Sequence, residues 1–375
     1  MTLIEDPKDI NFMRIALGLA RRGLGTVAPN PAVGCVIVNN NQIVGRGWTQ
    51  RGGRPHAETE ALKRAGARAR GSTVYVTLEP CAHHGVTPPC AAALIEAGVK
   101  RVVIAMRDPD PRVNGGGVRM LEQENISVVL GLLEREAGEV NRGFLTKIKS
   151  GRPMVTVKIA SSLDGSIATR TGHSQWITGE GARNFGHLAR ATHDAILVGS
   201  GTVIQDNPSL TCRLPGLEDC SPIRLVLCGK RILDPGCTLA QTAGQVPSWC
   251  FLPSGTGTKV PGSVDALRGV GVEVYEIDGD QKDRLNLHLV LKKLADEGIT
   301  RVLVEGGSSI ISSLLSADLV DRIIWFRAPI IIGSDGTRAV GKLGIDDLAF
   351  AKAFTRTSFR EIGNDVIECL ERRSE

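Results

Sequence analysis

Apolar and polar positions along the first 140 residues predict helices and strands in turn. One face of the segment "DINFMRIALGLARRG" carries apolar residues at helical spacing: Ile10, Met13, Leu17 and Ala20. Gly23 marks the expected end of that helix. The short apolar runs "AVGCVIV", "STVYVTL" and "VKRVVIAM" are typical of buried strands, and "AETEALKRAG" and "CAAALIEAG" of helices. This alternation predicts a layered α/β sheet.

A second α/β pattern follows a join rich in glycine and lysine, "NRGFLTKIKSGRP" (141–153). Its apolar strand candidates include "MVTVKIA", "DAILVGS", "PIRLVLC", "WCFL", "ITRVLVEGG" and "DRIIWFRAPIII". Helices are expected at about 180–191, 286–297 and 308–316. The stretch "PSGTGTKVPGS" (253–263) is expected to be a flexible surface loop.

Length and composition indicate a globular chain with two domains. A chain of 375 residues is long for one domain, and we place the two at 1–148 and 149–375. The net charge of +5 is spread along the chain and only 4% of residues are aromatic, so a nucleic-acid partner is not expected. No apolar run approaches the roughly 18 residues of a membrane span. Nine cysteines without an export signal predict reduced thiols in the cytoplasm.

Four residues in two short segments point to metal-assisted hydrolysis. His56 in "HAETE" offers an imidazole nitrogen, and Cys81 and Cys90 in "LEPCAHHGVTPPC" offer thiolates. Three such ligands suit a tetrahedral Zn²⁺ whose fourth position is left for a water, and zinc lowers the pKa of that water to about 7. Glu58, near an expected helix start, can carry the water's proton to a ring nitrogen and to departing ammonia. This order of residues predicts a zinc nucleobase deaminase.

Three alternatives remain at this point. A closed structural zinc site would use His83 or His84 as a fourth ligand, but it leaves Glu58 without a role. An RNA-binding or RNA-editing protein is opposed by the spread charge and by the eight residues between the two cysteines. A catalytically dead structural paralogue is opposed by the intact set of ligands and acid–base residue.

Two glycine-rich turns in the second half favour the binding of a phosphate. The segment "GSGTVI" (199–204) follows an apolar strand but lacks the third glycine of a dinucleotide fingerprint, and "DNP" (206–208) ends any long helix. A Rossmann domain is therefore not favoured. The segment "VEGGSS" (304–309) places two glycines and a serine at a helix start, where N–H groups suit an anion. The alternative is that these two glycines form only a tight turn.

Taken together, the motifs resemble the bifunctional deaminase–reductase family of riboflavin biosynthesis over nearly the whole chain. The deaminase half rests on "APNPAVGCVIV", "HAETEAL" and the wide cysteine spacing. The reductase half rests on "KIASSLDGSIAT", "GHSQWIT", "VGSGTVIQDNPSLTCR", "VEGGSSIISSLL" and "PIIIGSDG", which occur in the family's order. The resemblance implies a cytidine-deaminase-like three-layer α/β/α domain with Zn²⁺, followed by a dihydrofolate-reductase-like α/β domain with NADPH.

The resemblance also implies the reactions. A diaminopyrimidinone that carries a ribosylamino 5′-phosphate would first be deaminated by zinc-dependent hydrolysis. NADPH would then reduce the ribosyl group to a ribityl chain, and the cofactor itself would carry the hydride chemistry. The family forms dimers or tetramers, so we expect a homo-oligomer that acts on a small molecule, with no nucleic-acid or membrane partner.

Individual roles follow from the same resemblance. His56, Cys81 and Cys90 would hold zinc, with Glu58 as the proton shuttle. Substrate contacts in the deaminase half would come from Asn30 and His83. The residues expected to line NADPH are Ala160, Trp176, Thr202, Asp206 and Gly307. The residues expected to hold the reductase substrate are Ser174, Arg190, Leu210, Arg213 and Glu305. Lys158 and Asp206 are the candidates for supplying a proton.

The chain departs from the family pattern at its phosphate and cofactor contacts. Thr49 and Val86 stand where the family often has basic residues. Either Arg51 or Arg54 replaces them, or the chain acts on another phosphorylated aminopyrimidine. The pair Cys228–Gly229 replaces the usual Asp-Ser, so one cofactor contact is expected to be missing.

Overall fold

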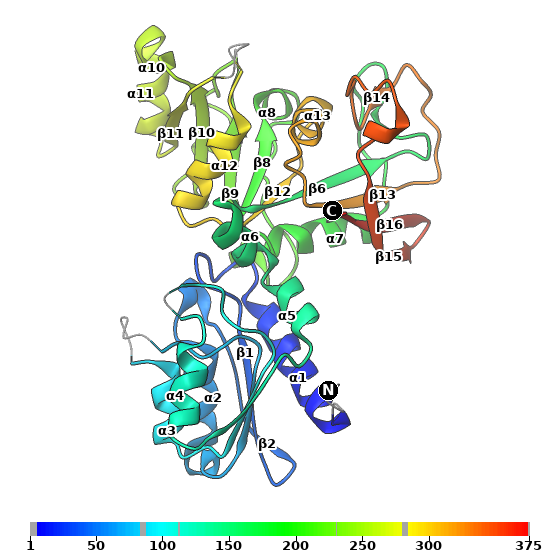
Figure 1. Ribbon diagram of the computed structural model, residues 1–375. Helices are drawn as coiled ribbons and strands as arrows, with labels where there is room; N and C mark the ends of the chain where they lie inside the picture. Colours follow the sequence, from blue (N-terminus) through cyan, green and yellow to red (C-terminus); the bar gives the residue numbers. More distant parts are fainter. Residues whose placement is uncertain (1–5, 83–87, 112, 230, 280–283, 374–375) are drawn as a thin grey trace. The chain divides into compact units, whose positions relative to one another are not determined.

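The computed structural model describes residues 6–82, 88–111, 113–229, 231–279 and 284–373 (Figure 1). The described chain forms two compact units that divide between Gly151 and Arg152. Each unit has its own central sheet and its own hydrophobic core. In the described part of the chain, no helix is long and apolar enough to cross a membrane.

The first unit is built on a five-stranded sheet with the order β2-β1-β3-β4-β5. The strands are β1 (Gly34–Asn39), β2 (Gln42–Trp48), β3 (Thr73–Val76), β4 (Arg101–Ile104) and β5 (Ser127–Leu130). The pairs β1–β2 and β1–β3 are antiparallel, whereas β3, β4 and β5 run parallel. The middle strands are almost continuously buried, as expected for a sheet covered by helices on both faces.

Helices cover both faces of this sheet, which confirms the predicted three layers (Figure 1). One face carries α1 (Pro7–Ala20) and α5 (Glu134–Val140), and the other carries α2 (Ala57–Ala65), α3 (Cys90–Glu96) and α4 (Gly116–Gln123). Glycine in β2 allows α2 to pack very closely, because a Cβ added at Gly47 would lie 2.1 Å from the Ala57 carbonyl oxygen. This contact fixes the start of α2 against the sheet.

The segment that joins the two patterns (141–153) is mostly helical, and the sequence analysis assigned no element to it. Residues Arg142–Ser150 form α6. Its apolar residues Phe144, Leu145 and Ile148 recur at helical spacing, and Phe144 is buried. The high content of glycine and lysine concealed this pattern. Gly151, in a left-handed conformation, ends the helix.

The second unit is built on a nine-stranded sheet with the order β11-β10-β9-β8-β12-β6-β13-β16-β15. The strands are β6 (Met154–Ser161), β8 (Ala195–Gly199), β9 (Ile223–Leu227), β10 (Ser248–Pro253), β11 (Glu273–Ile277), β12 (Arg301–Val304), β13 (Arg322–Arg327), β15 (Phe354–Ile362) and β16 (Asp365–Arg372). A separate ribbon pairs β7 (Ser166–Ala168) with β14 (Thr337–Arg338). Strands from β11 to β13 pair in parallel, and β16 and β15 add antiparallel pairs at one edge.

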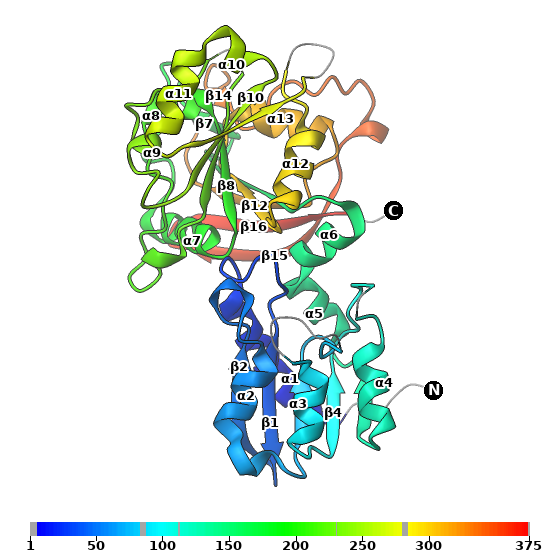
Figure 2. The same ribbon diagram turned by 90° about the vertical axis from the view of Figure 1, so that its left-hand side faces the viewer.

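Helices also cover both faces of the second sheet (Figure 2). One face carries α12 (Leu287–Asp296) and α13 (Ser308–Ser316), and the other carries α7 (Glu180–Ala191), α8 (Ser200–Asp206), α9 (Thr238–Gln241) and α11 (Pro261–Gly269). The helices predicted near 180–191, 286–297 and 308–316 are confirmed. Short 3₁₀ turns are η1 (Arg21–Gly23), η2 (Arg51–Gly53), η3 (Gly66–Ala69), η4 (Glu218–Cys220) and η5 (Leu348–Phe350).

The predicted loop at 253–263 contains helical structure instead. Thr256–Lys259 forms α10, and Pro261 begins α11 at a position where its missing N–H costs nothing. Val264 and Leu267, three residues apart, are buried and hold α11 on the sheet. Proline, glycine and threonine suggested a loop, but tertiary packing decided the outcome.

Candidate functional site

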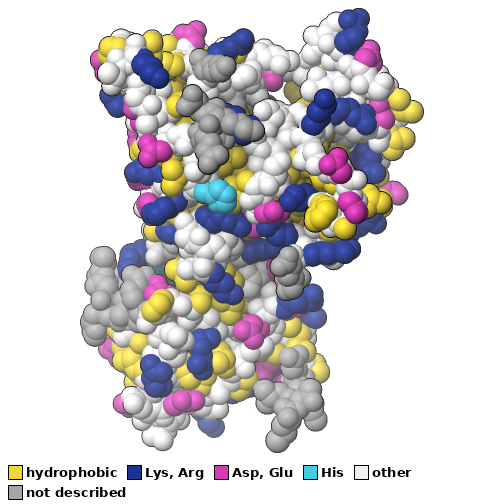
Figure 3. All heavy atoms as spheres, turned by 45° about the horizontal axis from the view of Figure 1, so that its top comes forward, with side chains coloured by type: hydrophobic (Ala, Val, Ile, Leu, Met, Phe, Trp, Pro, Cys, Tyr) yellow, Lys and Arg dark blue, Asp and Glu magenta, His cyan; other side chains and the backbone are white. Residues whose placement is uncertain are grey.

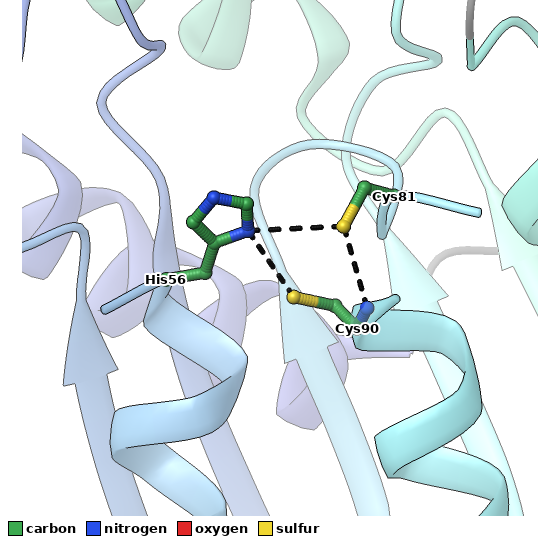
Figure 4. A group of neighbouring side chains, drawn as sticks. All are labelled: His56, Cys81 and Cys90. Atoms are coloured by element: carbon green, nitrogen blue, oxygen red, sulfur yellow. Dashed lines mark hydrogen bonds between the residues drawn. The ribbon is translucent and has the colours of Figure 1, made fainter. Parts of the chain in front are cut away.

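Three side chains of metal-ligand type converge in the first unit (Figure 4). His56 immediately precedes α2, Cys90 begins α3, and Cys81 lies in the segment after β3. Nδ1 of His56 lies 3.3 Å from Sγ of Cys90 and 3.8 Å from Sγ of Cys81. All three ligand atoms lie within 4.8 Å of one another, the only such group of His, Cys, Asp and Glu side chains among the described residues.

The electrostatics of this group suit a divalent cation. Contact with the Cys90 thiol lowers the pKa of Cys81 to about 4, and the Cys90 N–H also donates to Sγ of Cys81 at 3.3 Å. Contact with Cys81 and burial raise the pKa of Cys90. One imidazole and two sulfur donors fit the preferences of zinc, and three donors leave one tetrahedral position for a water or substrate. His83 and His84, the candidate fourth ligands of a closed site, lie outside the described residues.

A carboxyl group lies next to this cluster. Glu58 is in the first turn of α2, two residues after His56, and its side chain is buried at 4% exposure beside the Cys90 thiol. Burial raises the pKa of Glu58 to about 7, although the charge of His56 opposes the rise. A carboxyl group with a pKa near neutrality can both accept and release protons, which is the property required of an acid–base residue.

The surrounding loops account for several other predicted residues. Asn30 packs against the turn that leads to His56, because a Cβ added at Gly53 would lie 1.9 Å from Nδ2 of Asn30. Thr49 is 2% exposed, and its Oγ1 accepts a hydrogen bond from the Val33 N–H at 3.0 Å. This internal hydrogen bond stabilises the segment that follows β2. Hydrogen bonding to Cys81 raises the pKa of His56, whereas the nearby charge of Arg54 opposes this rise. His83 and Val86 lie outside the described residues.

Glu79 supports the ligand loop and was not identified from the sequence. Its buried carboxylate accepts N–H groups from Asp108 at 3.3 Å, Gly115 at 3.0 Å and Val118 at 3.1 Å. These bonds tie the residue two positions before Cys81 to the start of α4. No local pattern signals this role, because all three donors lie far along the chain.

In the second unit, Arg190 and Glu305 form a buried ion pair. Nε of Arg190 lies 2.7 Å from Oε1 of Glu305, and Nη2 lies 2.9 Å from Oε2. Nζ of Lys158 is 3.7 Å from Oε2 of Glu305. Burial alone would raise the pKa of Glu305, but the charges of Arg190 and Lys158 outweigh it and lower the pKa to about 2. The carboxylate therefore stays ionised while it organises two cationic groups.

The segment after α8 lies against this ion pair. Nη1 of Arg190 donates to the Thr211 carbonyl oxygen at 3.0 Å. Leu210 is buried at a positive φ of 54°, and the backbone N–H of Arg213 donates to Nδ1 of His187 at 3.3 Å. Three predicted substrate residues, Arg190, Leu210 and Arg213, thus lie in one neighbourhood, and their roles remain predictions.

A separate cavity of about 1270 Å³ lies at the carboxyl ends of the parallel strands. Two of the predicted cofactor residues, Thr202 and Gly307, line it. Gly201 also lines it, and a Cβ added there would meet no atom within 4 Å and so would occupy open cavity. The glycine turns after β8 and β12 stand next to each other, since a Cβ at Gly199 would lie 2.9 Å from Cδ1 of Ile310. Size, position and glycine-rich walls fit a dinucleotide.

The other predicted reductase residues do not line this cavity in the structure. Trp176 is 67% exposed, and the Arg183 guanidinium lies 4.6 Å from the centre of its ring. Ala160 pairs with Phe326 in the sheet, and Asp206 is exposed at the end of α8. Ser174 is half-buried in the loop before α7. That loop is connected to the cavity wall, because Nε2 of Gln205 donates to the Gly172 carbonyl oxygen at 3.1 Å.

We expect the Cys81→Ala substitution to reduce bound zinc from about one ion per chain to nearly none, because two donors seldom hold a structural or catalytic zinc ion. Elemental analysis of the purified chain measures this directly. The Cys220→Ser variant is the matched control, since this half-buried thiol lies in the second unit, outside the cluster. Full zinc content in Cys81→Ala would show that the metal is held elsewhere.

Each of the two units matches a known protein family. Residues 6–106 match the cytidine and deoxycytidylate deaminase zinc-binding region, and residues 153–367 match the RibD C-terminal domain. These matches confirm the predicted fold class and the combination of a deaminase with a reductase. They also support Zn²⁺ and NADPH as the cofactors.

Relatives of known identity match along almost the entire chain. The riboflavin biosynthesis protein RibD of Bacillus amyloliquefaciens is 43% identical over 358 residues, covering 95% of this chain and 94% of that protein. The structure of Acinetobacter baumannii RibD (form 1) is 36% identical, with a TM-score of 0.87 over 98% of this chain and 99% of that chain. A Thermotoga maritima deaminase/reductase structure is 35% identical, with a TM-score of 0.85 over 98% and 99% of the two chains. The chain therefore belongs to the RibD family, which combines a zinc-dependent deaminase with an NADPH-dependent reductase in riboflavin biosynthesis.

Proposed function

We propose that residues 1–148 deaminate diaminohydroxyphosphoribosylaminopyrimidine and that residues 149–375 then reduce the resulting phosphoribosylaminouracil. The Thermotoga maritima protein of similar structure is a diaminohydroxyphosphoribosylaminopyrimidine deaminase and 5-amino-6-(5-phosphoribosylamino)uracil reductase. The observation that carries the proposal is the buried Glu58 carboxyl group beside three convergent zinc ligands. A purely structural zinc site has no need for such a carboxyl group.

In the deaminase reaction, His56, Cys81 and Cys90 hold the zinc ion. When bound, zinc supplies Lewis-acid activation of a water molecule. Glu58 accepts the proton that the attacking water loses and gives it to the ring nitrogen. It then accepts the proton of the newly added hydroxyl group and gives it to the amino group, which leaves as ammonia. Its buried position and its raised pKa support this cycle, because the protonated and ionised forms are then close in free energy. Asn30, next to the turn before His56, orients the pyrimidine ring.

In the reductase reaction, Arg190, Arg213, Leu210 and Ser174 hold the phosphorylated substrate. When bound, NADPH supplies the hydride that reduces the sugar carbon. Glu305 holds Arg190 and Lys158 in place. The ammonium group of Lys158 gives a proton to the sugar oxygen as the sugar ring opens. Asp206 is the weaker candidate for this proton, because it is exposed at the end of α8.

The proposal is tested by incubating the zinc-loaded chain with the diaminopyrimidinone phosphate. We expect ammonia release without NADPH, and NADPH oxidation only after ammonia has been released. Weak turnover at high enzyme concentration would instead favour another phosphorylated aminopyrimidine. The buried Thr49 is the reason for considering a different substrate, because its side chain cannot replace a basic residue that contacts the phosphate.

We also propose that the chain is a cytoplasmic homo-oligomer that does not bind nucleic acid. All nine cysteines are free, and β15 forms an exposed edge of the sheet with Phe359 54% exposed. Figure 3 shows Lys and Arg side chains interspersed with Asp and Glu over the face in view, which does not favour a polyanion there. Light scattering coupled to gel filtration measures the assembly, and a monomer would contradict this part of the proposal.

A further inference from the structure

Two side chains of α7 hold the segment 209–213, which contains the predicted substrate residue Arg213. Nη1 of Arg190 donates to the Thr211 carbonyl oxygen at 3.0 Å, and the backbone N–H of Arg213 donates to Nδ1 of His187 at 3.3 Å. His187 and Arg190 are three residues apart on α7, so their side chains lie on the same side of the helix. The two hydrogen bonds therefore fasten alternate residues of the segment to one helix.

The hydrogen bond from Arg190 does not depend on pH in the neutral and mildly acidic range. A guanidinium group stays protonated, and Nε of Arg190 lies 2.7 Å from the Glu305 carboxylate. Burial would raise the pKa of Glu305, but the charges of Arg190 and Lys158 lower it to about 2. Both members of the ion pair are therefore charged in this range, and Arg190 holds the segment throughout it.

The hydrogen bond to His187 requires a neutral imidazole ring. A backbone N–H group can only donate, so Nδ1 of His187 accepts and carries no proton while this bond is present. Protonation of the ring places a hydrogen on Nδ1 and removes the acceptor. The charged ring instead donates to the Thr211 carbonyl oxygen, a hydrogen bond that favours the protonated form but does not hold Arg213. Only the neutral ring therefore fastens the Arg213 backbone to α7.

The surroundings of His187 favour its neutral form. Burial is the main cause that lowers the pKa of His187 below its ordinary value of 6.5, and the charges of Arg190 and Arg213 lower it further. The charge of Glu305, which follows β12, opposes this effect. Charged side chains on the other neighbouring elements are Lys158 in β6 and Glu218 and Asp219 in η4. The ring therefore becomes charged only below pH 6.5, where Arg190 and Glu305 both remain ionised.

The position of the Arg213 backbone affects the direction of its side chain. Nη1 of Arg213 donates to Oγ of Ser209 at 3.0 Å, within the same segment. The side chain is exposed, so it is not fixed by a packed core. The orientation of the guanidinium group therefore depends on the hydrogen bond to Ser209 and on the backbone hydrogen bond to His187.

We propose that His187 is a positioning residue of the reductase site, which in its neutral form holds Arg213 in place to bind the phosphate group of the substrate. When His187 is protonated, the Arg213 backbone is released from α7 and the substrate binds more weakly. This contact does not touch the reacting sugar carbon, so the effect falls on KM rather than on kcat. The inference rests on the proposed contact between Arg213 and the substrate.

The test is the steady-state oxidation of NADPH by the full chain, with the deaminated intermediate as the substrate. We expect His187→Leu to raise KM roughly three- to tenfold at about pH 8, with kcat within about twofold of the wild type. His187→Asn should restore KM to within about twofold, because the amide oxygen lies close to the position of Nδ1 and also accepts a hydrogen bond. Asn184→Ala, at an exposed position of the same helix, is the matched control and should change neither constant.

The pH dependence separates this role from a purely structural one. As the pH falls below 6.5, KM of the wild type should rise relative to KM of His187→Asn, because the imidazole loses its acceptor and the amide does not. The substrate phosphate titrates with a pKa of about 6, but it does so for both enzymes and cancels in this ratio. The ratio of KM between His187→Leu and His187→Asn should stay constant with pH.

An unchanged KM in His187→Leu, or a constant ratio of KM between the wild type and His187→Asn, would overturn the inference. Failure of His187→Asn to restore KM would also overturn it. Arg213→Gln separates this result from the proposed function. If Arg213→Gln leaves KM unchanged, Arg213 does not bind the substrate and both ideas fail. If Arg213→Gln raises KM while His187→Leu does not, only the role of His187 fails.

Discussion

Glu58→Gln is expected to lower the rate of ammonia release roughly 10²- to 10⁴-fold, because the amide cannot accept the proton of the attacking water. Zinc content should be unchanged, since the three proposed ligands His56, Cys81 and Cys90 remain. The reductase reaction, started from the deaminated intermediate, should also be unchanged, because its residues lie in the other unit. Ammonia release, elemental analysis and NADPH oxidation measure these three quantities on one sample.

Glu60→Gln is the matched control for this substitution. Glu60 lies on the same helix and pairs with Arg64 at 3.3 Å in a partly exposed contact. Pairs of this kind contribute little, so activity should stay within about twofold of the wild type. Rapid ammonia release by Glu58→Gln with full zinc would exclude Glu58 as the proton shuttle and would require another acid–base group.

Glu305→Gln should have the largest effect on the second reaction. The substitution removes the negative charge that lies 2.7 Å from Arg190 and 3.7 Å from Lys158. These two partly buried cationic side chains then lose the carboxylate that they share. Breaking one side of a buried pair typically costs about 3–5 kcal/mol of folding stability. We expect NADPH oxidation to fall roughly 10- to 100-fold, because the cationic groups lose their positions. Ammonia release from the first unit should persist.

Glu371→Gln is the control, since it breaks another half-buried Arg–Glu pair of the same sheet, with Arg322 at 2.7 Å. That pair lies in β13 and β16, outside the cavity lining, so reductase activity should be retained. Equal loss of activity in both variants would attribute the effect of Glu305→Gln to general destabilisation. Retained activity in Glu305→Gln would exclude a role in the reaction.

The same substitution has a defined dependence on pH. The pKa of Glu305 in the folded chain, about 2, is below its ordinary value of 4.5 because of the charges of Arg190 and Lys158. Its ionised form therefore stabilises the fold fully above pH 4.5, and this contribution is lost as the pH falls toward 2. The difference in unfolding free energy between wild type and Glu305→Gln should shrink from about pH 5 to about pH 3.

Local sequence patterns predicted most of the elements and the metal cluster. Strands such as Gly34–Asn39 and Thr73–Val76 are short apolar runs, and helices such as Ser308–Ser316 have clear start signals. His56, Cys81 and Cys90 were found because their chemistry and order are distinctive even without a structure. Local composition failed at α10, where proline, glycine and threonine suggested a loop but the folded chain contains a helix. It gave no element for the segment that forms α6.

By itself, the sequence determined which side chains are available for zinc chemistry and where buried strands and helices occur, because both depend on residue type and short-range spacing. Only the tertiary structure decided which distant residues meet. Glu305 pairs with Arg190 across 115 positions, Glu79 binds N–H groups up to 39 positions away, and Arg231 and Arg284 share one cavity. These contacts follow from the order in which parallel strands assemble, and no local periodicity encodes that order.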